Sequence, residues 1–165
     1  MEGSRRTDMA RAHKGIEYAK HVNHMKVEEL HRRLRTSNTT RQFGFVLTEA
    51  EPSRILLRMR VAQRHKQVHG VVHGGVLAAL ADTAGGLATY MAVPHGTRVA
   101  TIEMKINYLE AVEAGTVTAA AHVVRLGRHI AVVDCDLSVE ERLVGKALMT
   151  FFVGPFRKNR KKRSR

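Results

Sequence analysis

The stretch Val72–Asp82, VHGGVLAALAD, places a carboxylate inside an otherwise apolar segment. Burying an unpaired carboxylate costs several kcal/mol, which is comparable to the net stability of a whole domain. From residue 67 to residue 97, Asp82 is the only formally charged side chain. Apolar residues occur all round this segment until Pro94 and Gly96 stop it, as they do in a helix surrounded by protein. We therefore predict a buried central helix whose acid meets a distant partner or the wall of a cleft.

Six segments of strand-like sequence flank this helix, two before it and four after it. The connections EPS, EAVEAG, GR and ER are each too short to contain a crossover helix. We therefore predict that successive strands are antiparallel neighbours, or nearly so, with a turn at Pro52. The predicted fold class is α+β, with one buried central helix packed against a six-stranded antiparallel sheet. The expected strands are residues 43–50, 53–62, 97–109, 115–126, 129–140 and 142–153.

The N-terminal segment predicts an accessory helix with one apolar stripe and basic flanks. It extends from Thr7 to Arg35, and the stretch RTSNTTRQ then breaks its periodicity. We expect this helix to lie on the domain or on a neighbouring subunit. The chain thus divides into a basic helical extension (1–40), one globular domain (41–154) and a basic tail (155–165) that is expected to be disordered. The apolar stripe consists of Met9, Ile16, Ala19, Val22, Leu30 and Leu34.

The formal net charge of +13 belongs mostly to the two ends of the chain. Residues 37–156 carry twelve Lys and Arg against ten Asp and Glu, whereas residues 157–165 carry seven basic residues and no acid. Such a tail can bind phosphates without sequence selectivity, although a short run of charge is more often simply solvated. Contact of the tail with nucleic acid is therefore an alternative rather than the primary prediction.

Neither the N-terminus nor the apolar run indicates a secreted or membrane-spanning protein. The N-terminus lacks the apolar stretch of a secretory signal, and its acids argue against a transit peptide. The run Val76–Val93 approaches the length of a membrane span, but it contains Asp82 and much Ala and Gly, which favours a core helix. Cys135 is the only cysteine, so no intramolecular disulfide can form. We expect a packed, reduced thiol and a cytoplasmic protein, with a reactive thiol as the less favoured alternative.

The start of the central helix offers donors for a developing negative charge. Gly74 and Gly75 stand where a loop enters the helix, so their N–H groups can point outward beside the positive end of the helix dipole. Such a position suits the oxygen of a carbonyl under attack, although a Gly-Gly pair alone is more often a simple turn. Asp82 has no Lys or Arg within fifteen residues on either side. It suits a general base or a nucleophile toward an acyl group, unless it caps another backbone segment.

The spacing of these groups predicts a site built from two chains. Seven or eight residues of helix put Asp82 about 10–12 Å from the Gly74 and Gly75 amides. Reacting atoms must approach to about 3–3.5 Å, so the two groups of one chain cannot act on the same carbonyl carbon. A two-fold dimer with antiparallel central helices would bring Asp82 of one subunit to the glycines of the other.

The sequence HGG at residues 73–75, followed by Asp82, resembles the hotdog-fold acyl-CoA thioesterases, specifically the phenylacetate-pathway (PaaI-like) branch with its HGG…D signature. The similarity extends over about residues 43–153, through GVVHGG, LADTAGGLA, TIEMKINYLEAVEAG and LVGKALMTFFV. It implies the hotdog fold, in which a curved six-stranded antiparallel sheet wraps around the long central helix. It also implies a homodimer with active sites between the subunits, often a homotetramer, and hydrolysis of an acyl-CoA thioester to a carboxylic acid and free CoA. It implies no cofactor, because coenzyme A is part of the substrate.

The resemblance also implies roles for individual residues. The Gly74 amide would polarise the thioester carbonyl, and Asp82 of the partner subunit would activate water or attack directly. His73 would shape the loop, with a contact to the thioester or the leaving sulfur, and Thr101 would help to position water. Gln67 stands where many relatives have Asn, which leaves hydrolysis intact but the acyl preference open.

Two further groups of residues are candidates for binding the substrate. The Gly75 backbone would lie beside Gly74 at the reacting carbonyl. Arg125 and Arg128, around the turn LGR, would meet the CoA phosphates unless they are simply solvated turn residues. The resemblance covers neither the N-terminal helix nor the basic tail.

Two other functions and a metal site are weaker alternatives. A non-catalytic hotdog protein could sense or sequester acyl-CoA with its basic ends on nucleic acid, but Asp82 is retained and one N-terminal helix is too little for a helix-turn-helix module. A hotdog dehydratase or hydratase would need a different placement of His and acid. A metal bound by His65, His69 and His73 would require a helix that Gly70 disfavours, so we predict no metal.

Overall fold

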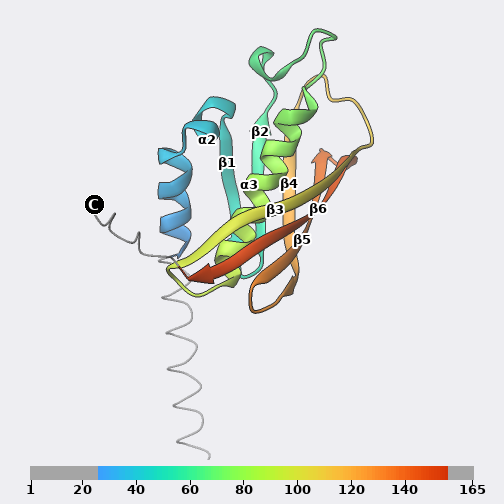
Figure 1. The fold of residues 1–165 in the computed structure, drawn as a ribbon. Helices are drawn as coiled ribbons and strands as arrows, with labels where there is room; N and C mark the ends of the chain where they lie inside the picture. The colour runs from blue at the N-terminus through green and yellow to red at the C-terminus, as the bar shows by residue number, and fades with distance from the viewer. Residues whose placement is uncertain (1–25, 156–165) are drawn as a thin grey trace, which may run out of the picture.

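The computed structural model describes residues 26–155, which form one curved antiparallel sheet around a central helix (Figure 1). The strand order is β1-β2-β4-β5-β6-β3, and every neighbouring pair is antiparallel. This confirms the predicted fold class. The elements are a helix over residues 26–36, α2 (Asn38–Phe43), β1 (Phe45–Glu51), β2 (Arg54–Arg60), the 3-10 turn η1 (Gln63–His65), α3 (Gly74–Ala92), β3 (Thr97–Tyr108), β4 (Thr116–Leu126), β5 (Ile130–Val139) and β6 (Arg142–Pro155).

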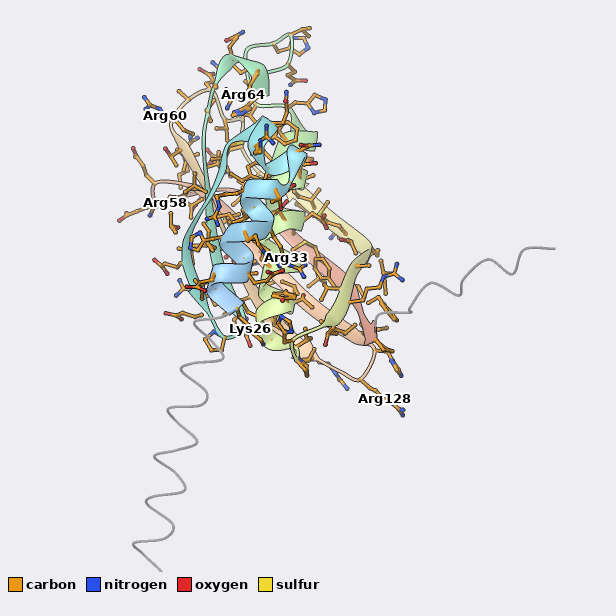
Figure 2. All side chains as sticks on the ribbon, turned by 90° about the vertical axis from the view of Figure 1, so that its left-hand side faces the viewer. Lys26, Arg33, Arg58, Arg60, Arg64 and Arg128 are labelled. Atoms are coloured by element: carbon orange, nitrogen blue, oxygen red, sulfur yellow. The ribbon has the colours of Figure 1, made fainter. Side chains whose placement is uncertain are left out.

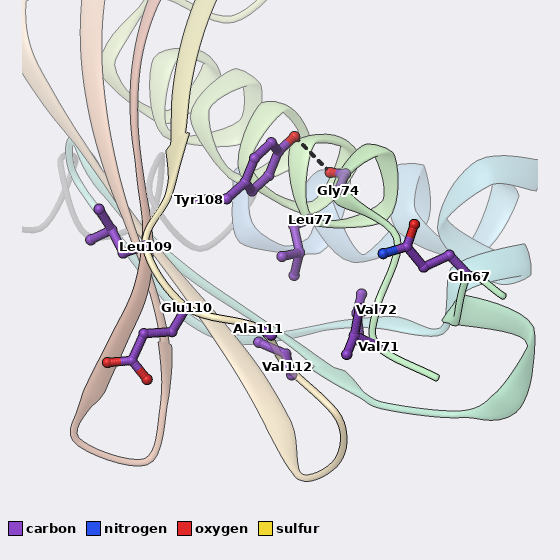
Figure 3. A pocket seen from close by; sticks show the side chains of 10 residues that line it. All are labelled: Gln67, Val71, Val72, Gly74, Leu77, Tyr108, Leu109, Glu110, Ala111 and Val112. Carbon is purple, nitrogen blue, oxygen red and sulfur yellow. Dashed lines mark hydrogen bonds between the residues drawn. The ribbon is translucent and has the colours of Figure 1, made fainter. Parts of the chain in front are cut away.

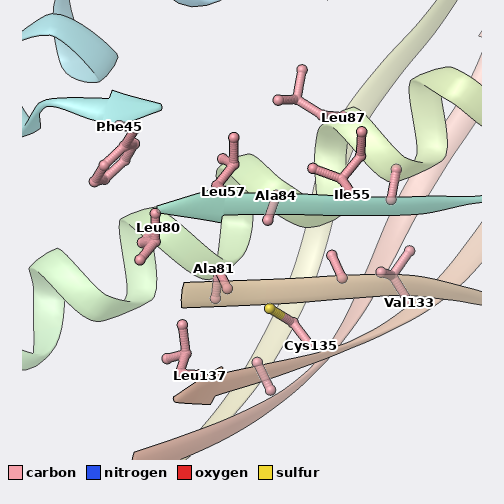
Figure 4. Close-up of a cluster of buried hydrophobic side chains, with 14 of the residues drawn as sticks. Phe45, Ile55, Leu57, Leu80, Ala81, Ala84, Leu87, Val133, Cys135 and Leu137 are labelled. Carbon is pink, nitrogen blue, oxygen red and sulfur yellow. The ribbon is translucent and has the colours of Figure 1, made fainter. Parts of the chain in front are cut away.

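The helix α3 is the centre of the hydrophobic core, as its all-round apolar sequence predicts. It contacts all six strands, and its buried side chains meet those of β2 and β5 (Figure 4). A Cβ added to Gly85 would lie 2.7 Å from Met149 Cε on β6, so the end of the Met149 side chain would have to shift to make room for a larger residue. The labelled core residues are Phe45, Ile55, Leu57, Leu80, Ala81, Ala84, Leu87, Val133, Cys135 and Leu137.

The strand β3 lies at the edge of the sheet, beside β6, and this differs from the simplest sequence-based expectation. The short connection 109–115 suggested that β3 and β4 would be neighbours or nearly so, but β5 and β6 lie between them. Crossing three strand spacings requires about 14 Å. Seven residues can reach beyond about 20 Å when extended, so the connection is long enough to pass over the end of the sheet.

The segment before β1 contains a helix that the sequence did not lead us to expect. Residues 38–42 were assigned to a break in the pattern, and β1 was expected to begin at Phe43. Instead α2 occupies these residues, with Ser37 as its N-cap and Gly44 as its C-cap at φ +69°. Both capping residues are typical of helix ends, so the signal was present in the sequence. The turn predicted at Pro52 is confirmed, because β1 ends at Glu51 and β2 begins at Arg54.

The helix over residues 26–36 packs against the C-terminal end of α3 (Figure 2). Leu30 and Leu34, the last two residues of the predicted stripe, are buried, and Arg33 lies 4.2 Å from the centre of the Tyr90 ring. The expected part of this helix before residue 26, and the basic tail from residue 156, lie outside the described residues. The predicted division at residues 40 and 154 stays a prediction.

A half-buried ammonium group joins this helix to the end of α3. Lys26 Nζ donates hydrogen bonds to the carbonyls of Met91 (3.0 Å) and Val93 (2.6 Å). The last carbonyls of a helix have no partners within the helix, and a cation there also favours the helix dipole. Burial lowers the pKa of the Lys26 side chain from its ordinary value.

Cys135 is a packed thiol, as predicted. It is fully buried on β5, and burial, followed by the charges of Asp136 and Asp134, raises its pKa to about 12. Because the thiolate is the reactive form, this cysteine is inert at neutral pH. No helix among residues 26–155 combines the length and the apolar character that crossing a bilayer requires.

Replacing Lys26 by Met should lower the free energy of unfolding by about 1–2 kcal/mol, since the carbonyls of Met91 and Val93 lose a charged donor while the aliphatic stem is kept. Arg35→Met, at an exposed position of the same helix, is the control and should change the stability by less than about 0.5 kcal/mol. Urea unfolding measures both variants. Equal losses in the two variants would contradict the capping role of Lys26.

Candidate active site

The loop that leads into α3 is held by backbone hydrogen bonds rather than by helical structure. Lys66 and Val72 form an isolated β-bridge, and the Val72 N–H donates to the Val112 carbonyl at 2.7 Å. The His73 N–H donates to the His65 carbonyl at 2.8 Å. Because the loop is not helical, the three histidines at residues 65, 69 and 73 are not aligned on one face. Within residues 26–155, no group of three His, Cys, Asp or Glu side chains is placed to hold a metal ion.

The first turn of α3 leaves one glycine N–H without a partner. His73 is the N-cap, and its Nδ1 accepts from the Gly75 N–H at 2.9 Å. In the neutral imidazole the proton therefore resides on Nε2. The Gly74 N–H has no acceptor anywhere in residues 26–155. Of the two glycine amides named from the sequence, only that of Gly74 is free to bind the oxygen of a ligand.

A pocket of about 330 Å³ opens beside Gly74 (Figure 3). Gln67 reaches it from the loop, Leu77 from the next turn of α3, and Tyr108 from the end of β3. The Tyr108 hydroxyl donates to the Gly74 carbonyl at 2.8 Å. A helix N-terminus and an amide side chain thus face a largely apolar recess, which suits a polarised carbonyl with an apolar substituent. The pocket is lined by Gln67, Val71, Val72, Gly74, Leu77, Tyr108, Leu109, Glu110, Ala111 and Val112.

Asp82 lies on α3 away from this pocket and is paired with Thr101. The Thr101 hydroxyl donates to Asp82 Oδ1 at 2.8 Å, so β3 supplies the partner that the sequence around Asp82 lacks. The carboxylate is half-buried and is not among the residues that line the Gly74 pocket. Eight residues of helix separate it from Gly74, a rise of about 12 Å. One chain therefore holds the predicted residues in two separate groups, Gln67 with Gly74 and Asp82 with Thr101.

The two arginines proposed for CoA phosphates lie at the Asp82 end of the sheet. In the strand register, Thr101 is in one row with Phe151, Ala131 and Leu126, next to Arg125 and close to the turn that holds Arg128. Tyr108, beside the Gly74 pocket, is in a different row with Gly145, Leu137 and Ala119. Figure 2 shows Arg128 at the far end of the molecule from Arg64, which precedes the loop to α3. The arginines and Gly74 of one chain therefore do not meet.

His65 is a buried residue that holds the loop to α3, a role that sequence reasoning missed. Its side chain is fully buried, and its Nδ1 accepts from the Ala62 N–H at 3.1 Å. Its Nε2 has no hydrogen-bond partner within the described residues. Burial, followed by the charge of Arg64, lowers the pKa of His65, and a weaker interaction with the Phe43 backbone opposes this shift.

Tyr108 was also missed, although the sequence held a signal for it. It stands at the end of the predicted strand TIEMKINYL, where an aromatic ring with a polar hydroxyl is typical of a partly buried site. Its contact with Gly74 joins residues 34 positions apart, and no local pattern predicts which residue the hydroxyl meets.

Comparison with known proteins assigns the chain to a family. Residues 69–146 match the thioesterase superfamily. A "putative esterase" of Haemophilus influenzae is 42% identical over 83 residues, which cover 50% of this chain and 60% of that protein. A "putative esterase" of Bacillus subtilis is 34% identical over 103 residues, which cover 61% of this chain and 82% of that protein. Human acyl-coenzyme A thioesterase 13 is 28% identical over 93 residues, covering 56% of this chain and 66% of that protein. The match thus spans about three fifths of the first of these relatives.

Solved structures agree with this assignment. A thioesterase from Haemophilus influenzae superposes with a TM-score of 0.73 at 31% identity, covering 78% of this chain and 90% of that one. The PaaI protein of Escherichia coli, from the phenylacetic acid degradation operon, gives 0.73 at 22% identity over 79% and 94%, a likeness of fold. The chain belongs to the thioesterase superfamily and has the hotdog fold of that superfamily.

The pH dependence of stability should report the buried His65. Its pKa is lowered in the folded chain, whereas the unfolded chain binds a proton near the ordinary value of about 6.5. As the pH falls through about 6.5, only the unfolded chain gains this proton, so the stability present above that pH is lost. We expect His65→Asn, which can still accept from Ala62 but does not titrate, to have a shallower slope between about pH 7 and pH 5.

Urea unfolding at several pH values measures this slope. The control is His69→Asn, at an exposed position of the same loop, which should keep the slope of the unaltered protein. A slope in His65→Asn as steep as in the unaltered protein would show that another group titrates in this range.

Proposed function

We propose that the protein is an acyl-CoA thioesterase that hydrolyses its substrate to a carboxylate and free CoA. The observation that carries this proposal is the free N–H of Gly74, a residue that lies at the positive end of α3 and lines a largely apolar pocket. The name of the human relative points to the same substrate class. A thioester carbonyl would accept from Gly74 while its acyl group occupies the pocket, so the N–H would stabilise the oxyanion that forms on attack.

The exposed edge of β3 supports the proposal that the active unit is a dimer. β3 has twelve residues and, within the described residues, only β6 as a neighbour. Its Ile102 is 57% exposed and its Tyr108 is 49% exposed. A long exposed edge of this kind favours pairing with another strand, and a second copy of β3 is the self-complementary choice. A further association of dimers into a tetramer stays a prediction.

Such a pairing would complete the site from two chains. Thr101 and Tyr108 are seven residues apart on β3, about 23 Å along the strand. In an antiparallel pair centred between Met104 and Lys105, Thr101 of one chain lies opposite Tyr108 of the other. Asp82 of one subunit would then approach Gly74 of its partner, and the chain would contribute to two equivalent sites.

The proposed reaction uses a carboxylate, a water molecule and a backbone donor. Asp82, oriented by the hydrogen bond from Thr101, would either remove a proton from water or attack the carbonyl carbon itself. The C–S bond then breaks, and CoA leaves as its thiol after taking up a proton. After direct attack, the acyl group remains on Asp82 as an anhydride, and a water molecule must hydrolyse it to release the carboxylic acid and restore the Asp82 carboxylate. Gln67 would hold the acyl carbonyl or the water, and His73, with its proton on Nε2, would donate toward the thioester or the leaving sulfur.

The remaining parts of the proposal concern substrate binding and location. Arg125 and Arg128 of the subunit that supplies Asp82 would meet the CoA phosphates at the mouth of the shared site, and the Gly75 backbone would lie beside the bound carbonyl. Coenzyme A belongs to the substrate, so the reaction as proposed draws on no further cofactor. The HGG…D signature of the PaaI-like branch supports this assignment of roles. A cytoplasmic location stays a prediction, which rests on the expectation that the single thiol, Cys135, is reduced.

Asp82→Asn should lower kcat by about 10²- to 10⁴-fold, because the amide cannot act as base or nucleophile. The amide oxygen can still accept from Thr101, so the fold and the binding of acyl-CoA should be kept. Release of free thiol from a panel of aryl-acetyl, medium-chain and long-chain CoA esters measures the activity. Asp134→Asn, on the outer face of the sheet, is the matched control and should retain full activity.

Two results would contradict the proposal. Unchanged hydrolysis in Asp82→Asn would remove the assigned role of the carboxylate. Binding of acyl-CoA by the unaltered protein without any release of thiol would favour the non-catalytic alternative, a sensor or regulator that binds acyl-CoA with its basic ends on nucleic acid.

A further inference from the structure

The structure places Tyr108 in direct contact with the glycine that carries the free N–H. The Tyr108 hydroxyl donates to the Gly74 carbonyl at 2.8 Å (Figure 3). A Cβ built on Gly74 would lie 3.0 Å from Tyr108 Cζ and 3.2 Å from both Cε2 and the hydroxyl oxygen. The ring therefore packs against the space that a side chain at residue 74 would occupy.

We propose that Tyr108 is a positioning residue, which holds Gly74 in the orientation that aims its N–H into the pocket. This inference rests on the proposed thioesterase function. Glycine has the widest range of backbone conformations, and Gly74 is the first residue of its helix, where no intrahelical bond restrains its N–H. The Tyr108 hydroxyl and His73 Nδ1 hold the peptide group that follows the Gly74 Cα, through its C=O and its Gly75 N–H. The peptide group that precedes this Cα carries the Gly74 N–H, and its His73 carbonyl accepts from the Val76 N–H at 2.9 Å.

The backbone around Tyr108 is held by hydrogen bonds to β6, so the Tyr108 ring has a fixed position from which to hold Gly74. Tyr108 pairs with Gly145 on β6, and the N–H groups of Leu109 and Glu110 both donate to the Val144 carbonyl at 3.0 and 3.3 Å. The Glu110 carboxylate is paired with Arg142. The sheet edge thus supports the phenol ring, and the ring supports the first turn of α3.

The same ring forms one wall of the pocket, which gives Tyr108 a second measurable effect. Its side chain is 49% exposed and lies with Leu77 and Gln67 around the Gly74 carbonyl. A ring at this position limits the volume that an acyl group can occupy beside the reacting carbonyl. Removing only the hydroxyl should therefore alter the rate, whereas removing the whole ring should also alter which acyl groups are accepted.

Tyr108→Phe should lower kcat by about five- to tenfold, the factor expected for one neutral hydrogen bond, and should leave KM and the order of preferred acyl groups unchanged. Tyr108→Ala should lower kcat further and shift the preference toward bulkier acyl groups. Tyr90→Phe removes a hydroxyl about 24 Å farther along α3 and is the matched control, with kcat unchanged. Thiol release from the same panel of acyl-CoA esters measures all three variants.

The possible results separate this inference from the function on which it rests. If the unaltered protein is active and Tyr108→Phe keeps its full kcat, the positioning role is wrong and the proposed function stands. A rise in KM without a fall in kcat also overturns it, because the hydroxyl then acts on substrate binding alone. If the unaltered protein cleaves no ester of the panel, the proposed function fails and this inference fails with it.

Discussion

The rise of α3 between Gly74 and Asp82 is the constraint on which the proposed site depends. Eight residues of helix separate the two by about 12 Å, and the helix cannot shorten because the sheet encloses it. Leu80 and Ala81, which lie between them, are fully buried. The Gly74 N–H at the start of α3 and the Asp82 carboxylate near its middle therefore cannot both reach one carbonyl group. The proposed reaction therefore requires that the two groups come from different copies of the helix.

β3 is the second element of this arrangement, because it contacts both groups. Thr101 donates to Asp82 near one end of the strand, and Tyr108 donates to the Gly74 carbonyl at the other end. The strand also forms one edge of the sheet. An antiparallel partner along this edge would bring the two ends together with the correct polarity, so one contact would cover the edge and complete both sites.

The sequence predicted the elements that depend on local pattern. The apolar run of α3 identified the core helix, and the strand-like segments with short connections identified the antiparallel sheet. The isolation of Asp82 from any nearby cation indicated a distant partner or the wall of a cleft, and Thr101 is such a partner. The place of β3 was not predictable in this way, because the length of the 109–115 connection allows either a neighbouring strand or a crossing over the sheet end. α2 was missed because its six residues show too little periodicity, although Ser37 and Gly44 marked its ends.

Contacts between residues far apart in the chain could not be predicted from the sequence, for a physical reason. The bonds of Lys26 to the end of α3 and of Tyr108 to Gly74 join elements that meet only when the sheet closes around the helix. The residues proposed for catalysis came from a resemblance and a spacing argument, and the structure adds that they divide into two groups within one chain. It also shows that His73 Nδ1 accepts a hydrogen bond from the Gly75 N–H, which leaves the Gly74 N–H as the free donor.

Mixing two inactive variants tests most directly whether each site is shared between chains. One variant is Asp82→Asn, and the other is Gly74→Pro, which removes the free N–H. Proline is tolerated at the first residue of a helix, and His73 before it already has an extended backbone with ψ 133°. Gly74→Ala adds the same Cβ against Tyr108 but keeps the N–H, so it separates the loss of the donor from crowding.

The two variants are unfolded together, refolded at equal concentrations and assayed for release of thiol from an acyl-CoA ester. Each mixed dimer would contain one site with both wild-type groups, so random pairing should restore about one quarter of the wild-type activity. Either variant refolded alone should stay inactive. A mixture as inactive as its separate components would contradict a site shared between two chains.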